Sequence, residues 1–520
     1  MTTRLFGFLF GIAAFVLILS LSPPDSFGTT ATRLLAGVGG QIDPEALAGS
    51  MQRTLAVMAL MVVWWVTEAV PLPATALVPV VALPLLGVLG VQGGVVARST
   101  LGSVAANYAH PVIFLFLGGF LMAAAIRSWN LDRRLTLWIL SRGRLAEDPR
   151  LIMLAMMGMT AFISMWISNA ATTALMIPLA LGILSLLRAE PGRSKYGTGL
   201  LLGIAWAASI GGTGTMIGTP PNGITVGILN STLGHDPGYR PLTFIGWMQF
   251  GVPFVLLYVP LAWLLILKLF PPEVGRVEGG TRQMLGAFKA LGPLTRGEGL
   301  TLIALGLAAA LWIVLPLVRV LVPGISLGPL AGVDEYMVGI LVGVLMFVIP
   351  VDLRGGRFLL DWEATRSVEW GVLILFGGGL ALSDAMFRSG LALWIASTFI
   401  AVFGSPPTVI LVLAVMLLVV ALTEIASNTA VATMMVPVAI TIGKETGVSP
   451  AMLAVATGVA SSLAFMLPVS TPPNAMVFST GYISIRQMIR GGVLLDLIGW
   501  LLAAAVVYFL AGELLGIFPV

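Results

Sequence analysis

Long apolar stretches follow one another along almost the whole chain, separated by short clusters of charged residues, proline and glycine. Most have the roughly 17–25 residues that a helix needs to cross the roughly 30 Å hydrocarbon core of a bilayer. This pattern predicts an all-α polytopic membrane protein with about eleven transmembrane helices. The expected helices lie near residues 4–22, 52–70, 74–91, 111–127, 197–229, 247–270, 299–321, 334–350, 370–387, 449–483 and 491–513.

Two further apolar segments, residues 151–187 and 406–442, have a different length. Each is too long for one spanning helix and too short for two helices joined by a proper loop. Arginines precede and follow the first segment, and the positive-inside rule therefore places both of its ends in the cytoplasm. The sequence predicts two re-entrant helical hairpins that enter the membrane from opposite faces, with tips at Ser168-Asn169 and Ser427-Asn428. With a cytoplasmic N-terminus, this topology places most of the 27 Lys and Arg on the cytoplasmic side.

The composition agrees with a membrane protein, because 58% of the residues are hydrophobic and only 10% are charged. The net charge of +4 is therefore interpreted through the positive-inside rule, and no nucleic-acid partner is expected. The chain has no cysteine, which excludes disulfides and zinc-thiolate sites, and His110 and His235 are too few for a metal cluster. The apolar run after Arg4 could be a signal peptide, but no small-x-small cleavage site follows at once, which favours a retained first helix.

An internal repeat relates the two halves of the chain. The stretch FLGGFLMAAAI at 116–126 matches FGGGLALSDAM at 376–386, and IGTPPNGI at 217–224 matches VSTPPNAM at 469–476. The two Ser-Asn pairs occupy corresponding places between these motifs. An odd number of membrane crossings separates the corresponding elements, so the repeat has inverted topology. Inverted repeats with helices broken near the midplane are typical of secondary transporters.

The four polar motifs combine helix ends with neutral polar side chains. A hairpin tip presents free carbonyl groups from one helix and free N–H groups from the next, which attract a cation and an anion respectively. The Pro-Pro pairs of the other two motifs interrupt their helices. Asn amides and Ser and Thr hydroxyls add further donors and acceptors. Such a doubled site suits a small anion with two negative ends, together with a charge-balancing Na⁺.

Two interpretations of these polar residues stay open. Ser, Thr and Asn also join membrane helices by hydrogen bonds, although their duplication beside two Thr-Pro-Pro-Asn breaks favours a binding site. Glu424 lies three residues before Ser427 and is ionisable at membrane depth. It is either a functional group or a structural group that is paired within its hairpin.

The motifs resemble the divalent anion/sodium symporter family, which carries di- and tricarboxylates or sulfate. The resemblance runs from about residue 55 to the C-terminus and rests on WWVTEAVPLPATALVPV, FLGGFLMAAAI, SMWISNAATTALMIP, IGTPPN, WGVLILFGGGLAL, LTEIASNTAVATMMVP and STPPN, in the family's order. It implies a homodimer in which scaffold helices form the interface, while the transport domain of each protomer moves as a rigid elevator.

The resemblance also implies a division of the chain. The expected segments are N-terminal scaffold helices at 1–127, the first half of the transport domain at 128–246, second scaffold helices at 247–387, the second half of the transport domain at 388–490 and a C-terminal helix at 491–520. The first transport half holds the hairpin 151–187 and the broken helix 197–229, and the second holds the hairpin 406–442 and the broken helix 449–483.

By the same resemblance, the substrate lies between the two hairpin tips. The implied substrate-binding residues are Ser168, Asn169, Thr219, Ser427, Asn428, Thr429, Thr471 and Pro472. The implied sodium ligands are Ser164, Ser168, Asn169 and Gly218 at the first site, and Thr423, Ala426, Asn428 and Ser470 at the second. One position departs from the family pattern: Ala170 stands where the family usually has Thr, which bears on the identity of the substrate.

The sequence thus predicts a Na⁺-coupled importer of C4-dicarboxylates such as succinate, malate or fumarate, in a bacterial-type inner membrane and in contact with lipids. The alternatives within this fold are a sulfate or citrate symporter, or a sodium-independent dicarboxylate exchanger. An intramembrane enzyme would need paired aspartates, an activated Ser or metal ligands at depth, which the sequence lacks. An ion channel is a further alternative, because broken helices also line pores.

Overall fold

The computed structural model describes residues 2–36, 38, 43–142, 147–234, 236–277, 279–322, 328, 332–404 and 406–511. His235 and the last two residues of the expected helix 491–513 lie outside the described residues. The described chain is almost entirely helical, with two short antiparallel strand pairs at its periphery. The expected all-α membrane architecture is confirmed.

The N-terminal quarter of the chain forms a group of helices with one strand pair. Its elements are α1 (Thr2–Ser20), α2 (Asp25–Leu35), α3 (Pro44–Thr67), α4 (Leu72–Thr75), α5 (Val78–Leu85), β1 (Leu89–Gln92), β2 (Val95–Arg98), α6 (Leu101–Ala105), η1 (Ala106–Ala109) and α7 (Pro111–Ser128). The expected continuous helix 74–91 is wrong. Pro79 and Pro84 lie in this stretch, where proline removes a helical donor, and β1 begins before the expected helix would end.

The middle of the chain contains the first hairpin and the first broken helix. Its elements are α8 (Leu131–Leu140), α9 (Pro149–Ser164), α10 (Asn169–Leu186), α11 (Lys195–Gly212), α12 (Pro220–Leu233), α13 (Phe244–Leu269), α14 (Gly280–Ala290), α15 (Arg296–Leu321), α16 (Glu335–Val348), β3 (Pro350–Asp352), β4 (Arg357–Phe358) and η3 (Trp362–Ser367).

The C-terminal part repeats the hairpin and the broken helix. Its elements are α17 (Trp370–Ser389), α18 (Leu391–Phe403), α19 (Thr408–Thr423), α20 (Asn428–Thr446), α21 (Pro450–Ala460), α22 (Pro472–Ser479), α23 (Ile485–Val506) and the π-helical turn η4 (Val507–Ala511). The apolar helix α18 is a separate element that the sequence analysis did not anticipate.

Seven helices within the described ranges are long and apolar enough to cross a membrane, or nine if each of two bent pairs counts as one span. The sequence predicted about eleven spans. Four expected spans are missing from the seven or nine: 74–91, which is interrupted, α11 with α12, α21 with α22, and α16, which has only 14 residues. The seven in turn include the hairpin helix α10, which the sequence prediction did not count as a span. Each interrupted pair was counted as one span in the sequence prediction.

In both interrupted helices, the asparagine of the Thr-Pro-Pro-Asn motif donates hydrogen bonds to backbone carbonyl groups at the break. The Asn222 amide Nδ2 donates to Gly212 O at 2.9 Å and to Thr215 O at 2.7 Å. The Asn474 amide Nδ2 donates to Ala464 O at 3.2 Å and to Leu467 O at 3.1 Å. Carbonyl groups freed by each break are therefore satisfied in the same way in the two halves, as membrane burial requires.

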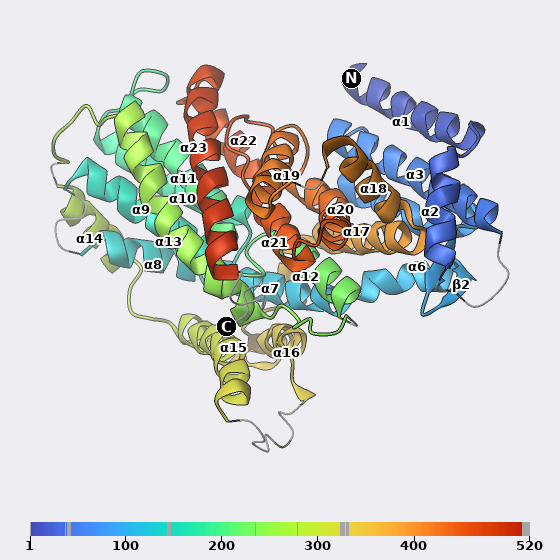
Figure 1. Ribbon diagram of the computed structural model, residues 1–520. Coiled ribbons are helices and arrows are strands. Elements are labelled where there is room, and N and C mark those ends of the chain that lie inside the picture. The colour runs from blue at the N-terminus through green and yellow to red at the C-terminus, as the bar shows by residue number, and fades with distance from the viewer. Residues whose placement is uncertain are drawn as a thin grey trace.

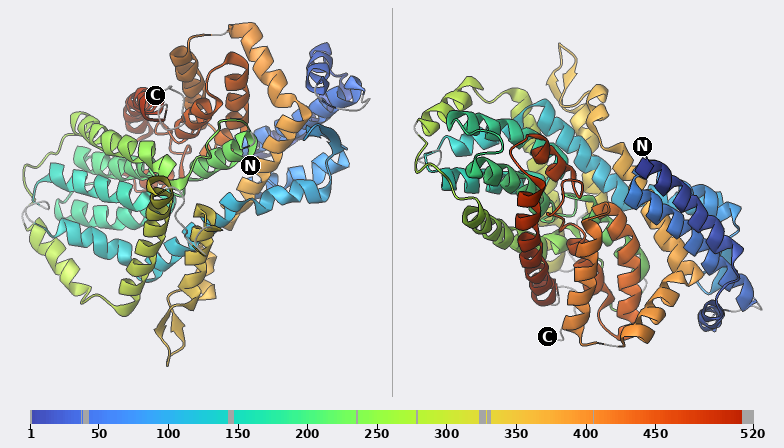
Figure 2. Two further views of the ribbon diagram at one scale, coloured as in Figure 1. Left: turned by 60° about the horizontal axis from the view of Figure 1, so that its bottom comes forward. Right: turned by 90° about the horizontal axis from the view of Figure 1, so that it is seen from above.

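The helices are grouped by their packing (Figures 1 and 2). The N-terminal helices α1–α6 lie at one end of the molecule, and α8–α11, α13 and α14 lie at the other, with α19–α22 between them. Helix α11 packs on α9, α10 and α13, and α21 packs on α19 and α20. The second halves cross over: α12 packs on α20, and α22 packs on α10. The two repeats are thereby joined into one body around the hairpins.

The helices α7 and α16 approach each other through glycines. A Cβ atom on Gly118 would lie 2.0 Å from the carbonyl oxygen of Gly339, which is backbone and cannot turn away. Gly118→Ala is therefore expected to lower the free energy of unfolding by about 1–3 kcal/mol. Thermal unfolding of the purified protein, followed by tryptophan fluorescence, measures this loss.

Gly158→Ala is the matched control, because Gly158 also lies within a helix and a Cβ atom there meets nothing within 4 Å. Its stability should be unchanged or slightly raised, since Ala has the higher helix propensity. Equal stabilities of the two variants would contradict the close packing of α7 on α16.

Candidate substrate and sodium site

The first hairpin tip is organised by Ser164 and Asn169. Ser164 is the last residue of α9, and Ser168 is the N-cap of α10. The Ser164 hydroxyl lies 2.8 Å from Asn169 Oδ1 and 2.7 Å from the carbonyl oxygen of Ala208 on α11. Ser164 is fully buried. The hydroxyl therefore connects the end of one hairpin helix, the start of the next and the neighbouring broken helix.

The second tip repeats this arrangement of a hydroxyl, an asparagine and a carbonyl group. Thr423 ends α19, and its hydroxyl lies 2.8 Å from Asn428 Oδ1 and 2.7 Å from the carbonyl oxygen of Ser461, which follows α21. Thr423 is also fully buried. The duplicated Ser-Asn motifs of the sequence thus fold into duplicated hydrogen-bond networks.

Oxygen atoms converge beside the first tip, where glycines allow close approach. A Cβ atom on Gly212 would lie 2.3 Å from Asn169 Oδ1, and one on Gly218 would lie 3.0 Å from Ser164 O and 2.4 Å from Gly212 O. Three of the expected sodium ligands, Ser164, Asn169 and Gly218, are therefore neighbours. Thr215 lies in the break between α11 and α12 and joins that break to the tip, because its hydroxyl donates to Met165 O at 2.5 Å.

At the second tip, the structure brings together Thr423 and Asn428 directly. Ala426 lies in the same tip, where its N–H donates to Leu422 O at 3.0 Å. The Ser470 hydroxyl instead donates to Leu467 O at 2.8 Å, within the break after α21. Among the described residues, no hydrogen bond joins Ser470 to Thr423 or Asn428.

The expected substrate residues lie at the N-terminal ends of four helices. Ser168 and Asn169 begin α10; Thr219 caps α12; Ser427, Asn428 and Thr429 begin α20; Thr471 and Pro472 begin α22. Thr219 and Thr471 have nearly equal backbone angles, with φ −146° and ψ 145° against φ −143° and ψ 150°. N-terminal helix ends offer free N–H groups and positive potential, which together favour an anion. Among the described residues, no hydrogen bond joins the two hairpin tips.

One residue of this region was missed by the sequence analysis. The Ser168 hydroxyl donates to Oε1 of Glu369 at 2.5 Å. Glu369 immediately precedes α17 in the stretch VEWGVLILFGGGLAL. A carboxylate beside a long apolar run was a visible signal, but nothing in the sequence indicated that it meets a hairpin tip 201 residues away.

Glu424 has a structural partner, although not within its own hairpin. Its Oε1 accepts hydrogen bonds from the N–H groups of Phe465 at 2.7 Å and Met466 at 3.0 Å, in the break after α21. Asp496 of α23 lies beside it and is 3% exposed. Neither Asp496 oxygen nor Glu424 Oε2 accepts a hydrogen bond from a described donor. The Glu424 contacts support the structural interpretation, because they fasten the second tip to the broken helix.

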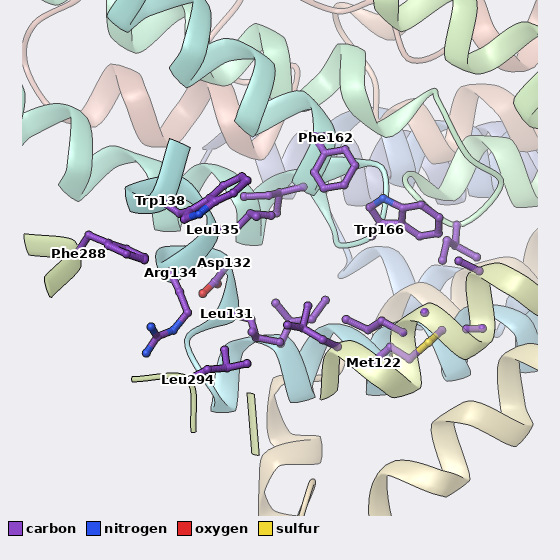
Figure 3. Close-up of a pocket in the computed structure, with 18 of the residues that line it drawn as sticks. Met122, Leu131, Asp132, Arg134, Leu135, Trp138, Phe162, Trp166, Phe288 and Leu294 are labelled. Atoms are coloured by element: carbon purple, nitrogen blue, oxygen red, sulfur yellow. The ribbon is translucent and has the colours of Figure 1, made fainter. Parts of the chain in front are cut away.

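A cavity of about 760 Å³ lies beside the first tip (Figure 3). Phe162 and Trp166 from the hairpin, Met122 from α7 and Trp138 from α8 line it. Its charged residues are Asp132 and Arg134.

The charges of this cavity offer little to a dianion. The guanidinium of Arg134 is paired with Glu298, with 2.5 Å between Nε and Oε1. Burial raises the pKa of the Asp132 carboxyl, because a charged carboxylate is poorly solvated there. The apolar lining does not suit a small dianion, so the polar helix ends at the tips are the better candidate site.

Known proteins are similar to this chain along nearly its whole length. The family model for the sodium:sulfate symporter transmembrane region matches residues 41–517. The sodium-dependent dicarboxylate transporter SdcS of Staphylococcus saprophyticus is 37% identical over 483 residues, which cover 91% of this chain and 89% of that protein. SdcS of Staphylococcus aureus strain MSSA476 is 35% identical over 483 residues, with 91% and 88% covered.

A solved structure has the same fold at lower identity. The YdaH transporter of Alcanivorax borkumensis, described as having an unusual topology, is 17% identical with a TM-score of 0.54. The match covers 88% of this chain and 98% of that chain. The family model matches nearly the whole chain, and SdcS is more than 30% identical to it. The chain therefore belongs to the sodium:sulfate symporter family, the divalent anion/sodium symporters that its motifs resemble.

Proposed function

We propose that the protein is a secondary active transporter that imports C4-dicarboxylates together with Na⁺. The observation that carries the proposal is the duplicated network in which Ser164 holds Asn169 and Thr423 holds Asn428. The SdcS relatives are named sodium-dependent dicarboxylate transporters, which supports both the substrate class and the coupling ion. Sulfate or citrate symport and sodium-independent exchange are the alternatives, and the relatives favour transport over an enzyme.

The anion would be held by neutral groups at helix ends. The two tips begin α10 and α20, and the two Thr-Pro-Pro-Asn breaks begin α12 and α22. Each tip would face one carboxylate of a dicarboxylate, with hydroxyls and amides as donors. We assign substrate contact to Ser168, Asn169, Thr219, Ser427, Asn428, Thr429, Thr471 and Pro472.

Sodium fits the other face of each tip. Hydroxyl, amide and carbonyl oxygens are suitable ligands for a hard cation, and the last carbonyls of α9 and α19 carry partial negative charge. We assign Ser164, Ser168, Asn169 and Gly218 to the first site, and Thr423, Ala426, Asn428 and Ser470 to the second. Because Asn169 and Asn428 belong to both sets, bound sodium would position the amide that meets the substrate.

We further propose an elevator mechanism in a homodimer in the inner membrane. The crossed packing of α12 on α20 and of α22 on α10 supports a transport unit in which both hairpins move together. Helix α13 packs on α9, α11 and α23, and we therefore place it with this unit, although the sequence analysis placed residues 247–387 with the scaffold. Helices α1–α7 and α15–α17 would form the scaffold.

The experiment that tests this function is uptake of radiolabelled succinate into proteoliposomes, with an inward Na⁺ gradient or with K⁺ in its place. Uptake is expected with the Na⁺ gradient and not with K⁺, because the dianion requires a co-bound cation for charge balance and the proposed sites bind Na⁺. Competition by unlabelled sulfate and citrate ranks the other anions. Equal uptake in both salts that depends on internal succinate would instead identify an exchanger.

Asn428→Ala is expected to abolish succinate uptake, because it removes an amide from both the anion site and the cation site. Size-exclusion chromatography of the variant should still give a folded protein. Asn107→Ala is the control: the Asn107 amide in η1 donates to the carbonyl oxygens of Ser103 at 3.4 Å and Val104 at 3.2 Å in the preceding helix α6, and uptake should be retained. Full uptake activity of the Asn428 variant would show that the second tip is not part of the binding site.

Thr423→Ala is expected to raise the Na⁺ concentration for half-maximal uptake roughly fivefold, because Asn428 loses a hydrogen bond of about 1 kcal/mol. Thr423→Ser keeps the hydroxyl and should restore the sodium dependence. A sodium titration of succinate uptake in both variants measures this. The assignment is wrong if the two variants have the same sodium requirement.

A further inference from the structure

Glu369 occupies an unusual position for a residue that caps a helix. It stands at the N-cap of α17, yet its side chain makes no capping hydrogen bond to its own helix. The carboxylate instead accepts a hydrogen bond from the Ser168 hydroxyl at 2.5 Å. Ser168 itself caps α10, where its oxygen lies 3.4 Å from the Ala171 N–H.

The carboxylate therefore lies where two helices begin. The N-terminal ends of α10 and α17 both carry free N–H groups and positive potential, and such ends bind anions. In the proposed function, the start of α10 is also the place that receives one carboxylate of the substrate. Glu369 thus places an anion from the protein itself at the first half of the anion site.

The repeat has no equivalent of this contact at the second tip. Matching FLGGFLMAAAI to FGGGLALSDAM aligns Glu369 with Ala109, which has no carboxylate. Ser427, the counterpart of Ser168, makes no capping hydrogen bond. The first tip also has Ala170 where the second has Thr429. The second tip in turn has Glu424 where the first has Met165, so each tip meets a carboxylate, but only the first does so through its serine.

The contact also joins two parts of the molecule. Helix α17 packs on α3, α4 and α5 and also on α12 and α20, whereas α10 packs on α9, α11 and α22. In the division proposed above, α17 belongs to the scaffold, so the hydrogen bond from Ser168 to Glu369 connects the first hairpin to that scaffold. If the hairpin body is the moving unit, this bond has to break before that unit can move.

We propose that Glu369 is a tethered competitor of the substrate, whose carboxylate holds the first hairpin tip until a carboxylate of the bound dianion displaces it. This inference rests on the proposed function. Two carboxylates at one helix end repel each other, so binding of substrate and binding of Glu369 exclude each other. Substrate binding would thereby release the tip from α17, which makes Glu369 a positioning residue that couples occupancy to movement.

The test is the KM of succinate uptake in Glu369→Gln and Glu369→Ala. Removing a competitor raises the fraction of binding-competent protein, and a tip that is held nine-tenths of the time predicts a roughly tenfold lower KM. The amide of Glu369→Gln still accepts a hydrogen bond, but a weaker one than the carboxylate, so its effect should be the smaller. The maximal rate should change less than the KM. A purely structural role predicts the opposite, an unchanged or higher KM together with a lower melting temperature.

Two controls isolate the contact. Glu363→Gln removes a neighbouring carboxylate that is exposed and paired with Arg366 at 2.9 Å, and its KM should equal that of the wild type. In a Ser168→Ala background, Glu369→Gln should produce no further fall in the KM, because the partner is already gone. A fall of the same size in that background would overturn the assignment to Ser168.

A measurement that does not need transport separates this inference from the proposed function. Because the chain has no cysteine, the double variant Ser168→Cys/Glu369→Cys reports the contact by crosslinking in membranes with a short bifunctional thiol reagent. Such a reagent is needed because glutamate reaches two atoms further than cysteine, and a direct disulfide would be too short. Crosslinking is expected, and its absence would overturn the contact.

If the wild type neither transports nor is thermally stabilised by succinate, sulfate or citrate, the proposed function fails. The competitor role then fails with it, whatever the crosslinking result. If the wild type transports succinate and Glu369→Ala leaves the KM unchanged, only the inference fails.

Discussion

The hydrogen bond between the hydroxyl that ends one helix and the asparagine that begins the next is the contact on which the binding region depends. In hydrocarbon, a helix can stop only where its free carbonyl and N–H groups find partners in the protein or line a cavity. Ser164 and Thr423 satisfy this condition, because each joins its hairpin tip to an interrupted helix as well as to its asparagine. The same geometry leaves an N-terminal helix end, which favours an anion, and a carbonyl end, which favours a cation, at each tip.

The two interrupted helices depend on a second asparagine. Asn222 and Asn474 each hold two carbonyl groups of the chain before them, so the Pro-Pro pairs can begin a new helix without leaving those carbonyls bare. Glu424 adds a further tie between the second tip and the break beside it. The candidate site is therefore a set of helix ends held by neutral side chains. The buried carboxylate of Glu424 fastens the second tip to the break after α21.

The symmetry of this region makes its departures informative. At the level of the hydroxyl–asparagine bonds the two halves agree within 0.1 Å, since the distances are 2.8 Å in both. They differ at Ala170 and at the contact with Glu369 of α17 on the first side, and at Glu424 on the second, where the first tip has Met165. In the proposed function, a pair of tips in which only the first donates its serine hydroxyl to a carboxylate would respond differently to substrate at its two ends. In the proposed transport cycle, that difference would place a point of control on one side.

The sequence by itself determined the all-α membrane fold, the inverted repeat and the places where helices break. These features follow from local causes: apolar length, the positions of proline, and Ser-Asn pairs that cap helices. The sequence did not determine that 74–91 is interrupted, that α18 is a separate helix, or that α12 packs on α20 and α22 on α10. Only the tertiary structure brought Ser168 to Glu369 and Glu424 to Asp496, because contacts between residues far apart in the chain depend on how helices pack, and an apolar helix surface packs equally well against many partners.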